Sequence, residues 1–334
     1  MDSPDSLGGI DRIGTRDAMT RLSLVVRQLS IGILDCEETL MPVFQRKPIL
    51  VPTDYSEASL QAIHAARSIA ENDSDVTVVH VAVDFDLTLH PLTWTGGPLP
   101  NYTEERLLLI LRQWCKDQDL GDVNLVVRKG DPGTEICEVA EEMGCRLIVV
   151  PSHGRHGVSR LLFGSVAERI IRHCHCSVLV LRRMKEDASV DEYVDFLSPQ
   201  RVVVPVDFSA ATSAAIATAL ELVHHRDGVD VISVIPSLDE IARYGAADKP
   251  DNVRLENCQQ HIAQYLVEHG HGPLSAHCLI GDPGTMIINY ASDVKADLIV
   301  MPSHGRHGLK RLVLGSTTER VLRHTEIPVL VLRE

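Results

Sequence analysis

Short apolar runs alternate with stretches of helical periodicity along most of the chain. Residues 49–52 (Ile-Leu-Val-Pro) form an apolar run suited to a buried strand. Asp54 and Ser56 then supply helix-start chemistry, and apolar side chains recur at helical spacing from Leu60 to Ile69. This opening predicts a strand, a short turn and a helix.

The same alternation continues over the following residues. It predicts a strand at 76–83, a helix at 102–117, a strand at 123–128, a helix at 135–143 that Thr134 caps after the turn 130–133, a strand at 146–150, a helix at 165–173 and a strand at 177–181. Five apolar strands alternating with helices predict the α/β class, with a doubly wound parallel sheet of the Rossmann-like type.

The whole pattern occurs twice. Residues 152–182 and 303–333 both begin SHGRHG and end VLVLR, at an offset of 151 residues. KGDPGTEI around Asp131 matches IGDPGTMI around Asp282, and ILVPTDYS at Ile49 matches VVVPVDFS at Val202. A period of this length exceeds any solenoid repeat, so it indicates a whole domain copied once.

These repeats define the expected domains. We predict an N-terminal extension at 1–45, a first five-stranded domain at 46–183, an acidic and polar linker at 184–200, and a second such domain at 201–334. The extension lies outside both copies. It can form an amphipathic helix that packs on a domain, and a partner or membrane-surface role is a weaker alternative.

Composition narrows the class of protein. Hydrophobic residues make up 44% and charged residues 23%, as in soluble globular proteins, and the net charge of −14 disfavours nonspecific nucleic-acid binding. The acidic N-terminus lacks a secretory pattern, and no stretch suits a membrane span, so we expect a cytoplasmic protein. The eight cysteines are irregularly spaced, without a CxxC pair, and we expect free thiols in a reducing compartment.

Two motifs follow strand ends in each copy, which is where open parallel sheets bind ligands. The first is Pro52-Thr53-Asp54, with Pro205-Val206-Asp207 in the second copy. The second is the loop 152–164 with the helix start at Ser165, and the loop 303–315 with Ser316.

The residue types in these motifs suit a phosphate or nucleotide. Glycines let the backbone approach an anion, and helix-start amides after Gly164 and Gly315 point donors at it. Ser165 and Ser316 can add a hydroxyl. The loops also carry cations that can neutralise phosphate: Arg155, Arg160, Arg306, Lys310 and Arg311.

Each motif also has a purely structural interpretation. The glycines can serve only as turns, Asp54 can serve only as a helix cap, and the loop cations can be solvated. The combination, present twice, favours phosphate or nucleotide binding, in which Asp54 and Asp207 can accept hydrogen bonds from a ribose or base.

Taken together, the segments VPTDYS, SHGRHGVSRLLFGS and ERIIRHCHCSVLVLR resemble the universal stress protein family, and the second copy matches equally well. The resemblance covers nearly all of residues 46–334. It implies a Rossmann-like domain, similar to the adenine nucleotide α-hydrolase fold, that dimerises through its last strand. In a tandem protein the halves would form an intramolecular pseudo-dimer, with a further homodimer as an option.

The ATP-binding branch of that family has a loop pattern of Gly, two residues, Gly, nine residues, then Gly-Ser or Gly-Thr. Gly154 and Gly164 fit the last two glycines of this pattern, as do Gly305 and Gly315. The first glycine is replaced in both copies, by Pro151 and Pro302. Proline has no amide hydrogen, which weakens a phosphate cradle, but the resemblance still implies ATP binding in at least one half.

The resemblance thus implies one ATP site in each half, which Mg²⁺ can accompany without a dedicated carboxylate cage. Thr53, Asp54 and Val81 would lie near the base and ribose, as would Val206, Asp207 and Val234. The first-half residues are Pro52, Thr53, Asp54, Val81, Ser152, Gly154, Gly164, Ser165 and Val166. The second-half residues are Pro205, Val206, Asp207, Val234, Ser303, Gly305, Gly315, Ser316 and Thr317.

The expected function is that of a nucleotide-responsive stress regulator that acts on unidentified protein partners. No complete Walker A sequence is present and no lysine follows Gly164, so we expect no enzyme, although slow ATP hydrolysis stays open. One alternative is a metal or redox sensor that uses His153, His156 and the His-Cys-His-Cys run at 173–176, which the second copy lacks. The other is an interaction scaffold with degenerate sites, which the two prolines favour.

Overall fold

The computed structural model describes residues 48–83, 103–152, 164–182, 199–238, 249–304 and 314–333. The chain divides into two compact units, Met1–Met41 and Pro42–Glu334. Every described helix and strand belongs to the second unit. The predicted extension 1–45 lies outside the described residues, as does most of the predicted linker. No helix in the described segments is long and apolar enough to cross a membrane.

The predicted alternation of strands and helices is confirmed in both halves. The first half consists of β1 (Ile49–Pro52), α2 (Glu57–Ile69), η2 (Asp73–Asp75), β2 (Val76–Ala82), α3 (Glu104–Asp117), β3 (Asn124–Lys129), α4 (Pro132–Glu142), β4 (Leu147–Pro151), α5 (Ser165–His173) and β5 (Ser177–Leu181). The second half consists of β6 (Val202–Pro205), α7 (Ala210–Leu222), η3 (Arg226–Gly228), β7 (Val229–Ile235), α9 (Asp251–Glu268), β8 (Ser275–Ile280), α10 (Pro283–Asp293), β9 (Leu298–Pro302), α11 (Ser316–His324) and β10 (Val329–Leu332).

The start of α4 differs from the prediction that Thr134 caps this helix. Asp131 is the N-cap, and its carboxylate accepts a hydrogen bond from the Thr134 backbone N–H at 3.0 Å. The helix therefore begins at Pro132, because the first helical position needs no N–H donor and suits proline. Asp282 caps α10 in the same way.

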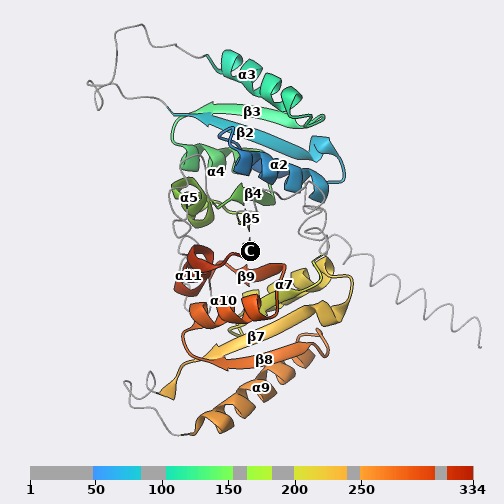
Figure 1. The fold of residues 1–334 in the computed structure, drawn as a ribbon, viewed down its shortest axis with the longest axis vertical. Helices are drawn as coiled ribbons and strands as arrows, with labels where there is room; N and C mark the ends of the chain where they lie inside the picture. The colour runs from blue at the N-terminus through green and yellow to red at the C-terminus, as the bar shows by residue number, and fades with distance from the viewer. Residues whose placement is uncertain are drawn as a thin grey trace, which may run out of the picture. The chain divides into compact units, whose positions relative to one another are not determined.

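The strands form one ten-stranded sheet in the order β3-β2-β1-β4-β5-β10-β9-β6-β7-β8 (Figure 1). Neighbours within each half are parallel, and strand order reverses between β1 and β4 and between β6 and β9. One core contains side chains of α2, α3, α7 and α9, and a second core, on the other face, contains side chains of α4, α5, α10 and α11. The predicted doubly wound α/β fold is therefore confirmed.

The two halves are joined by their last strands. β5 and β10 pair antiparallel, with Leu179 opposite Leu330. All five residues of β5 and all four of β10 are buried. Apolar side chains on both faces explain why these strands appear in the sequence as continuous apolar runs rather than as alternating ones.

Ion pairs across this junction follow the same two-fold pattern. Arg172 of α5 contacts Glu319 of α11 at 3.0 Å, and Arg323 of α11 contacts Glu168 of α5 at 3.4 Å. Burial alone would raise the pKa of Glu319, but hydrogen bonds from Arg323 and Arg172 outweigh it and hold this pKa below its ordinary value.

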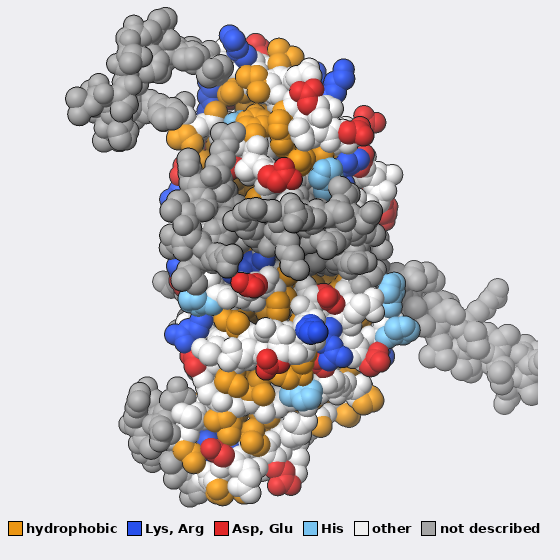
Figure 2. Space-filling view, in the orientation of Figure 1, with side chains coloured by type: hydrophobic (Ala, Val, Ile, Leu, Met, Phe, Trp, Pro, Cys, Tyr) orange, Lys and Arg blue, Asp and Glu red, His pale blue; other side chains and the backbone are white. Residues whose placement is uncertain are grey.

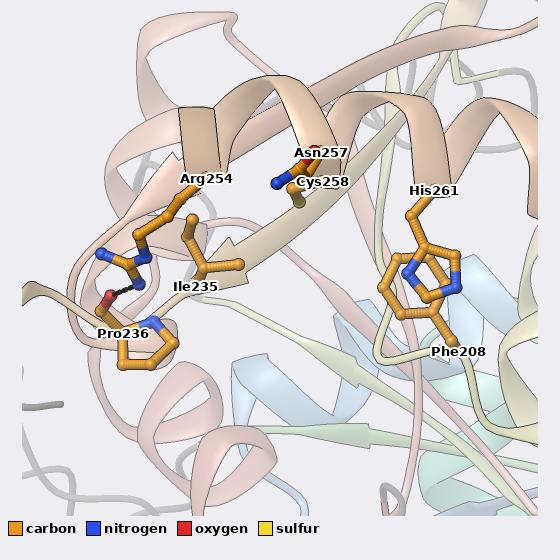
Figure 3. Close-up of a pocket in the computed structure, with 7 residues that line it drawn as sticks. All are labelled: Phe208, Ile235, Pro236, Arg254, Asn257, Cys258 and His261. Atoms are coloured by element: carbon orange, nitrogen blue, oxygen red, sulfur yellow. Dashed lines mark hydrogen bonds between the residues drawn. The ribbon is translucent and has the colours of Figure 1, made fainter. Parts of the chain in front are cut away.

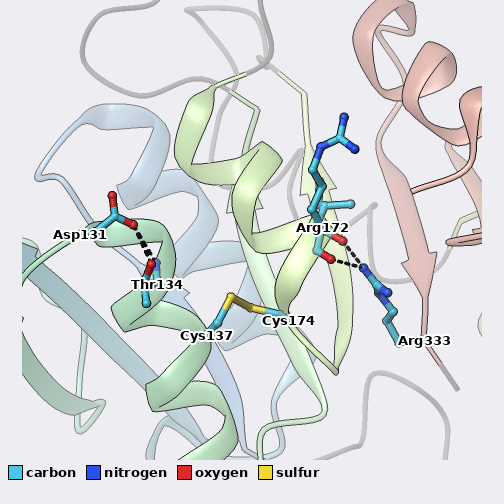
Figure 4. The surroundings of a disulfide bond; sticks show 7 residues. Asp131, Thr134, Cys137, Arg172, Cys174 and Arg333 are labelled. Carbon is cyan, nitrogen blue, oxygen red and sulfur yellow. Dashed lines mark hydrogen bonds between the residues drawn. A yellow bond between two sulfur atoms is a disulfide. The ribbon is translucent and has the colours of Figure 1, made fainter. Parts of the chain in front are cut away.

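Two further arginines reach across the junction to the ends of these helices. Arg182, which follows β5, donates to the backbone oxygen of Thr325 at the end of α11. Arg333, which follows β10, donates to the backbone oxygens of Ile171 and Arg172 at the end of α5 (Figure 4). Cations are favoured at helix C-termini, so each half stabilises the last helix of the other.

The expectation of free thiols is wrong for four of the cysteines. Cys137 of α4 is bonded to Cys174, which follows α5 (Figure 4), and Cys258 of α9 is bonded to Cys278 of β8. The remaining described cysteines are buried free thiols: Cys115, Cys145 and Cys176. Figure 2 shows Lys and Arg side chains scattered among Asp and Glu over the described part of the face that it displays.

The ion pairs at the junction predict an acid-sensitive contribution to stability. Because the pKa of folded Glu319 is depressed, its contribution is present above the unfolded-state pKa and is lost as the pH falls through the folded-state pKa. We expect Glu319→Gln to lower the free energy of unfolding by about 1 kcal/mol at pH 7 and by almost nothing at pH 3. Urea unfolding followed by circular dichroism at the two pH values measures both effects.

Glu138→Gln, at an exposed position of α4, is the matched control and should change the stability at neither pH. An equal loss for Glu319→Gln at both pH values would contradict the electrostatic account, because it would mean that the substitution acts through packing.

Candidate functional site

In each half, the two motifs predicted to bind a ligand follow neighbouring strands, at the point where the strand order reverses. In the first half the backbone N–H of Thr53 donates to the oxygen of Val79, and that of Ser152 donates to the oxygen of Leu181, both at 2.8 Å. Both residues therefore continue the hydrogen-bond pattern of β1 and β4 at the carboxyl edge. β1 and β4 are neighbours, so these two residues lie at the edge where open parallel sheets bind ligands.

Helix α5 begins at this same edge. The Gly164 backbone N–H donates to the Ser152 oxygen at 2.9 Å, and Gly164 is the N-cap of α5. Among the described residues no side chain caps the helix, and Ser165 and Val166 form the start of its first turn. The first amides of α5 are thus held next to the end of β4 without a side-chain acceptor of their own.

The second half repeats this geometry. The Val206 N–H donates to Ile232 at 2.8 Å, and the Ser303 N–H donates to Leu332 at 3.1 Å. Gly315, the N-cap of α11, donates to the Ser303 oxygen at 2.9 Å, again without a side-chain cap. The sequence-predicted helix starts, including Ser316 and Thr317, therefore lie at the same edge as Asp207.

The sheet register brings the predicted valines and prolines to this edge as well. Pro52 lies opposite Val79, so Val81 is two residues further toward the carboxyl edge. Pro205 lies opposite Ile232, so Val234 is likewise two residues further toward the carboxyl edge. Val81 belongs to the core that contains side chains of α4, α5, α10 and α11, and the partly buried Val234 packs against that core.

Asp54 and Asp207 shape the turns that follow β1 and β6. Asp54 accepts a hydrogen bond from the Ser56 N–H at 3.0 Å, and Ser56 is the N-cap of α2. Asp207 accepts from the Ser209 N–H at 3.1 Å and from the Thr212 hydroxyl at 3.0 Å. The two carboxylates therefore stabilise the turns themselves. Asp54 is not the N-cap of α2, as its structural interpretation from the sequence proposed, because Ser56 is the N-cap.

The residues after these aspartates were missed by the sequence reasoning. Tyr55 and Phe208 have positive φ angles of 63° and 60°, which is unusual for non-glycine residues and costs on the order of 1 kcal/mol. Tyr55 packs edge-on against Trp114, and Phe208 stacks on His261 with centroids 4.3 Å apart. An aromatic residue directly after the aspartate in both copies was the available signal.

A cavity adjoins the second-half turn. Its volume is about 330 Å³, and it lies between Phe208, the end of β7 and one face of α9 (Figure 3). The remaining lining residues are Ile235, Pro236, Arg254, Asn257, Cys258 and His261.

Part of the predicted site lies outside the described residues. Gly154 and Gly305 are among these, as are all five loop cations and His153 and His156. The metal alternative gains no support from the described segments, where no three His, Cys, Asp or Glu side chains form a metal-binding group. Cys174, from the run proposed as ligands, is bonded to Cys137.

The structure distinguishes two kinds of glycine near the site. A Cβ on Gly284 would lie 2.5 to 2.9 Å from carbons of the Arg320 side chain, so the fold itself requires glycine there. Gly315 has φ −63° and ψ 143°, which any residue adopts, and its Cβ would meet Ser303 at 3.5 Å, an ordinary contact. The described part of the fold does not explain why position 315 is glycine.

Comparisons with known proteins identify the family of the chain. The model of the universal stress protein family matches residues 45–182 and 199–333. The universal stress protein Rv2005c of Mycobacterium tuberculosis is 27% identical over 310 residues, 86% of this chain and 97% of that protein. The universal stress protein MJ0531 of Methanocaldococcus jannaschii is 33% identical over 144 residues, 42% of this chain and 85% of that protein.

Solved structures are also similar. A universal stress protein from Archaeoglobus fulgidus matches over 87% of this chain and 97% of its own, with 23% identity and a TM-score of 0.55, which shows the fold. A universal stress protein solved in complex with cAMP matches 41% of this chain, with a TM-score of 0.30.

The two glycines predict opposite responses to the same substitution. We expect Gly315→Ser to leave the free energy of unfolding within about 0.5 kcal/mol of the parent, because serine is a favoured N-cap. We expect Gly284→Ser to lower it by about 1–3 kcal/mol, because the new side chain overlaps Arg320. Urea unfolding of the two variants measures the difference, and an equal loss in both would show that the fold also requires Gly315.

Proposed function

The chain belongs to the universal stress protein family, and from this premise we propose that it is a nucleotide-binding regulator with one ATP site in each half. The observation that carries the proposal is the hydrogen bond from the N-cap glycine to the serine after the fourth strand. It is present twice, as Gly164 to Ser152 and as Gly315 to Ser303.

This bond holds an uncapped helix start at the edge of the sheet. The first amides of a helix lack partners within the helix, and the helix dipole is positive there, so the position favours a phosphate group. Gly315 is a glycine without a conformational or steric reason in the described fold. Close approach of a ligand to the backbone supplies such a reason.

The other predicted residues take roles around this phosphate site. Thr53 and Asp54 directly follow β1 and Val81 lies on β2, where a ribose and base would extend from the phosphates. Val206, Asp207 and Val234 occupy the same positions in the second half. The loop cations would neutralise the phosphates, and Mg²⁺ would accompany the triphosphate. We propose binding rather than catalysis, with the bound state passed on to protein partners.

The two prolines favour a second candidate, a scaffold whose sites no longer bind nucleotide. Pro302 ends β9, and its backbone oxygen accepts a hydrogen bond from the Thr318 hydroxyl at 3.2 Å. The residue thus has a structural function at the base of α11 and contributes no amide hydrogen to a phosphate cradle.

Calorimetric titration of ATP into the full chain tests the proposal. We expect two sites per chain, and Gly164→Val and Gly315→Val should each weaken one of them by roughly tenfold or more while leaving the other unchanged. The added branched side chain blocks the approach to the first amides of the helix. Glu138→Gln is the matched control and should bind like the parent.

Co-purified nucleotide, identified by mass spectrometry after denaturation, gives a second measurement. Absence of bound nucleotide together with no heat at millimolar ATP would leave the scaffold as the function. Pro302→Gly then distinguishes the cause, because recovery of binding in that variant would identify the missing amide as the reason.

A further inference from the structure

The disulfide between Cys258 and Cys278 lies at an edge of the sheet. It connects α9 to β8, the last strand in the sheet order, with Cα atoms 6.2 Å apart. The repeat offset of 151 residues places Leu107 and Val127 at the equivalent positions of the first half. Both are buried in the same core that contains Cys258, so the fold fills this position with apolar side chains and does not require a covalent bond there.

Cys258 lines the cavity beside Phe208 (Figure 3), where the residue is 8% exposed, and its partner Cys278 is half-buried. The other disulfide is in a different environment. Cys137–Cys174 lies between α4 and the end of α5 (Figure 4), and Cys174 is only 2% exposed. Each bond joins a buried cysteine to a half-buried one, so the adjoining cavity is the feature that sets the bond at Cys258 apart. Thiol–disulfide exchange depends on access of the attacking thiolate, and a cavity beside the bond favours that access.

We propose that Cys258 and Cys278 form a redox modification site that exchanges with low-molecular-weight thiols and disulfides and controls how firmly α9 is held on β8. In the oxidising direction one protein thiolate attacks a small disulfide, forming a mixed disulfide and releasing one small thiolate. The second protein thiolate then attacks the mixed disulfide, closes the Cys258–Cys278 bond and releases the second small thiolate. The two protons of the protein thiols are taken up by these leaving groups, and reduction is the reverse.

The described free thiols compete poorly with this site for small disulfides. The described free thiols are buried. Burial raises the pKa of Cys115 and Cys176 to about 11 and that of Cys145 to about 12, which leaves them protonated at neutral pH. Arg254 lies one helical turn before Cys258 and lines the same cavity, where its guanidinium is paired with the Asp251 carboxylate and donates to the Pro236 oxygen.

Loss of the bond has a definite structural consequence. In the reduced protein α9 is still held by the buried side chains of Ile262, Tyr265 and Leu266 in its later turns. It also keeps two side-chain hydrogen bonds, from Gln259 to the Ala276 oxygen of β8 and from Tyr265 to the Ser209 oxygen. Its earlier turns carry Arg254 and His261, which form one wall of the cavity against Phe208. We therefore expect the first half of α9 and the wall of the cavity to loosen on reduction, whether or not the protein binds nucleotide.

Thiol mapping of the full chain in glutathione buffers tests the proposal. Free thiols are alkylated with one reagent, the remaining disulfides are reduced and alkylated with a second, and mass spectrometry assigns each cysteine. We expect Cys258 and Cys278 to change together as the ratio of reduced to oxidised glutathione rises, while Cys137 and Cys174 stay bonded. Free thiols at 258 and 278 in oxidised glutathione, or earlier reduction of Cys137–Cys174, would overturn the proposal.

Hydrogen exchange measures the structural effect on the same samples. We expect exchange in residues 251–261 to become roughly tenfold faster on reduction, while α3 stays unchanged because its half lacks the bond. The chain provides both control variants. Cys258→Leu with Cys278→Val installs the pair found in the first half and should abolish the response to reductant.

Cys137→Ile with Cys174→Thr installs the residues that the second half has at those positions, Ile288 and Thr325, and should retain the response of α9. If Cys258 and Cys278 of the parent protein become reduced without any change in hydrogen exchange at 251–261, the proposal that this bond controls how firmly α9 is held is wrong. The parent measurement does not depend on the folding of either variant.

Discussion

The antiparallel pairing of β5 with β10 is the interaction on which the two candidate sites depend. Helices α5 and α11 have nine residues each, which is too short for stability in isolation. Each begins at a hydrogen bond to the end of its own strand and ends at an arginine from the opposite half. The strand pairing brings these arginines into reach. The helix start that we propose as the phosphate site of one half is therefore stabilised by residues of the other.

The other side of each site depends on a strained turn. Positive φ at Tyr55 and Phe208 is unfavourable for such residues, and it persists because the preceding aspartate bonds the turn and the aromatic ring packs on the neighbouring helix. Asp54 and Asp207 thus have a role in the fold that does not depend on a ligand. A ligand that contacted them would meet carboxylates whose orientation is already set, which lowers the entropy lost on binding.

Much of this could be predicted from the sequence because the information is local and occurs twice. The apolar runs and the glycine-serine helix starts depend on near neighbours, so α5 and β5 have the bounds that were predicted. The start of α4 was misassigned because Asp131 and Thr134 are both good caps, and the choice depends on Pro132. The disulfides could not be predicted, because residues 37 and 20 positions apart come together only through helix and strand packing.

The duplication also acts as an internal comparison of what the fold requires. Where the copies differ, as at Cys258 and Leu107, the architecture tolerates both residues, so a cross-link present in only one half needs a reason other than folding. Where the copies agree without a structural need, as at Gly315, the reason again lies outside the described fold. The helix-start glycine occurs in both halves, whereas the Cys258–Cys278 bond occurs only in the second half. There, α9 and α11 lie on opposite faces of the sheet, with Asp207 and Phe208 in the turn beside the cavity. A ligand at the helix start and a redox change at α9 would therefore act on neighbouring parts of one domain.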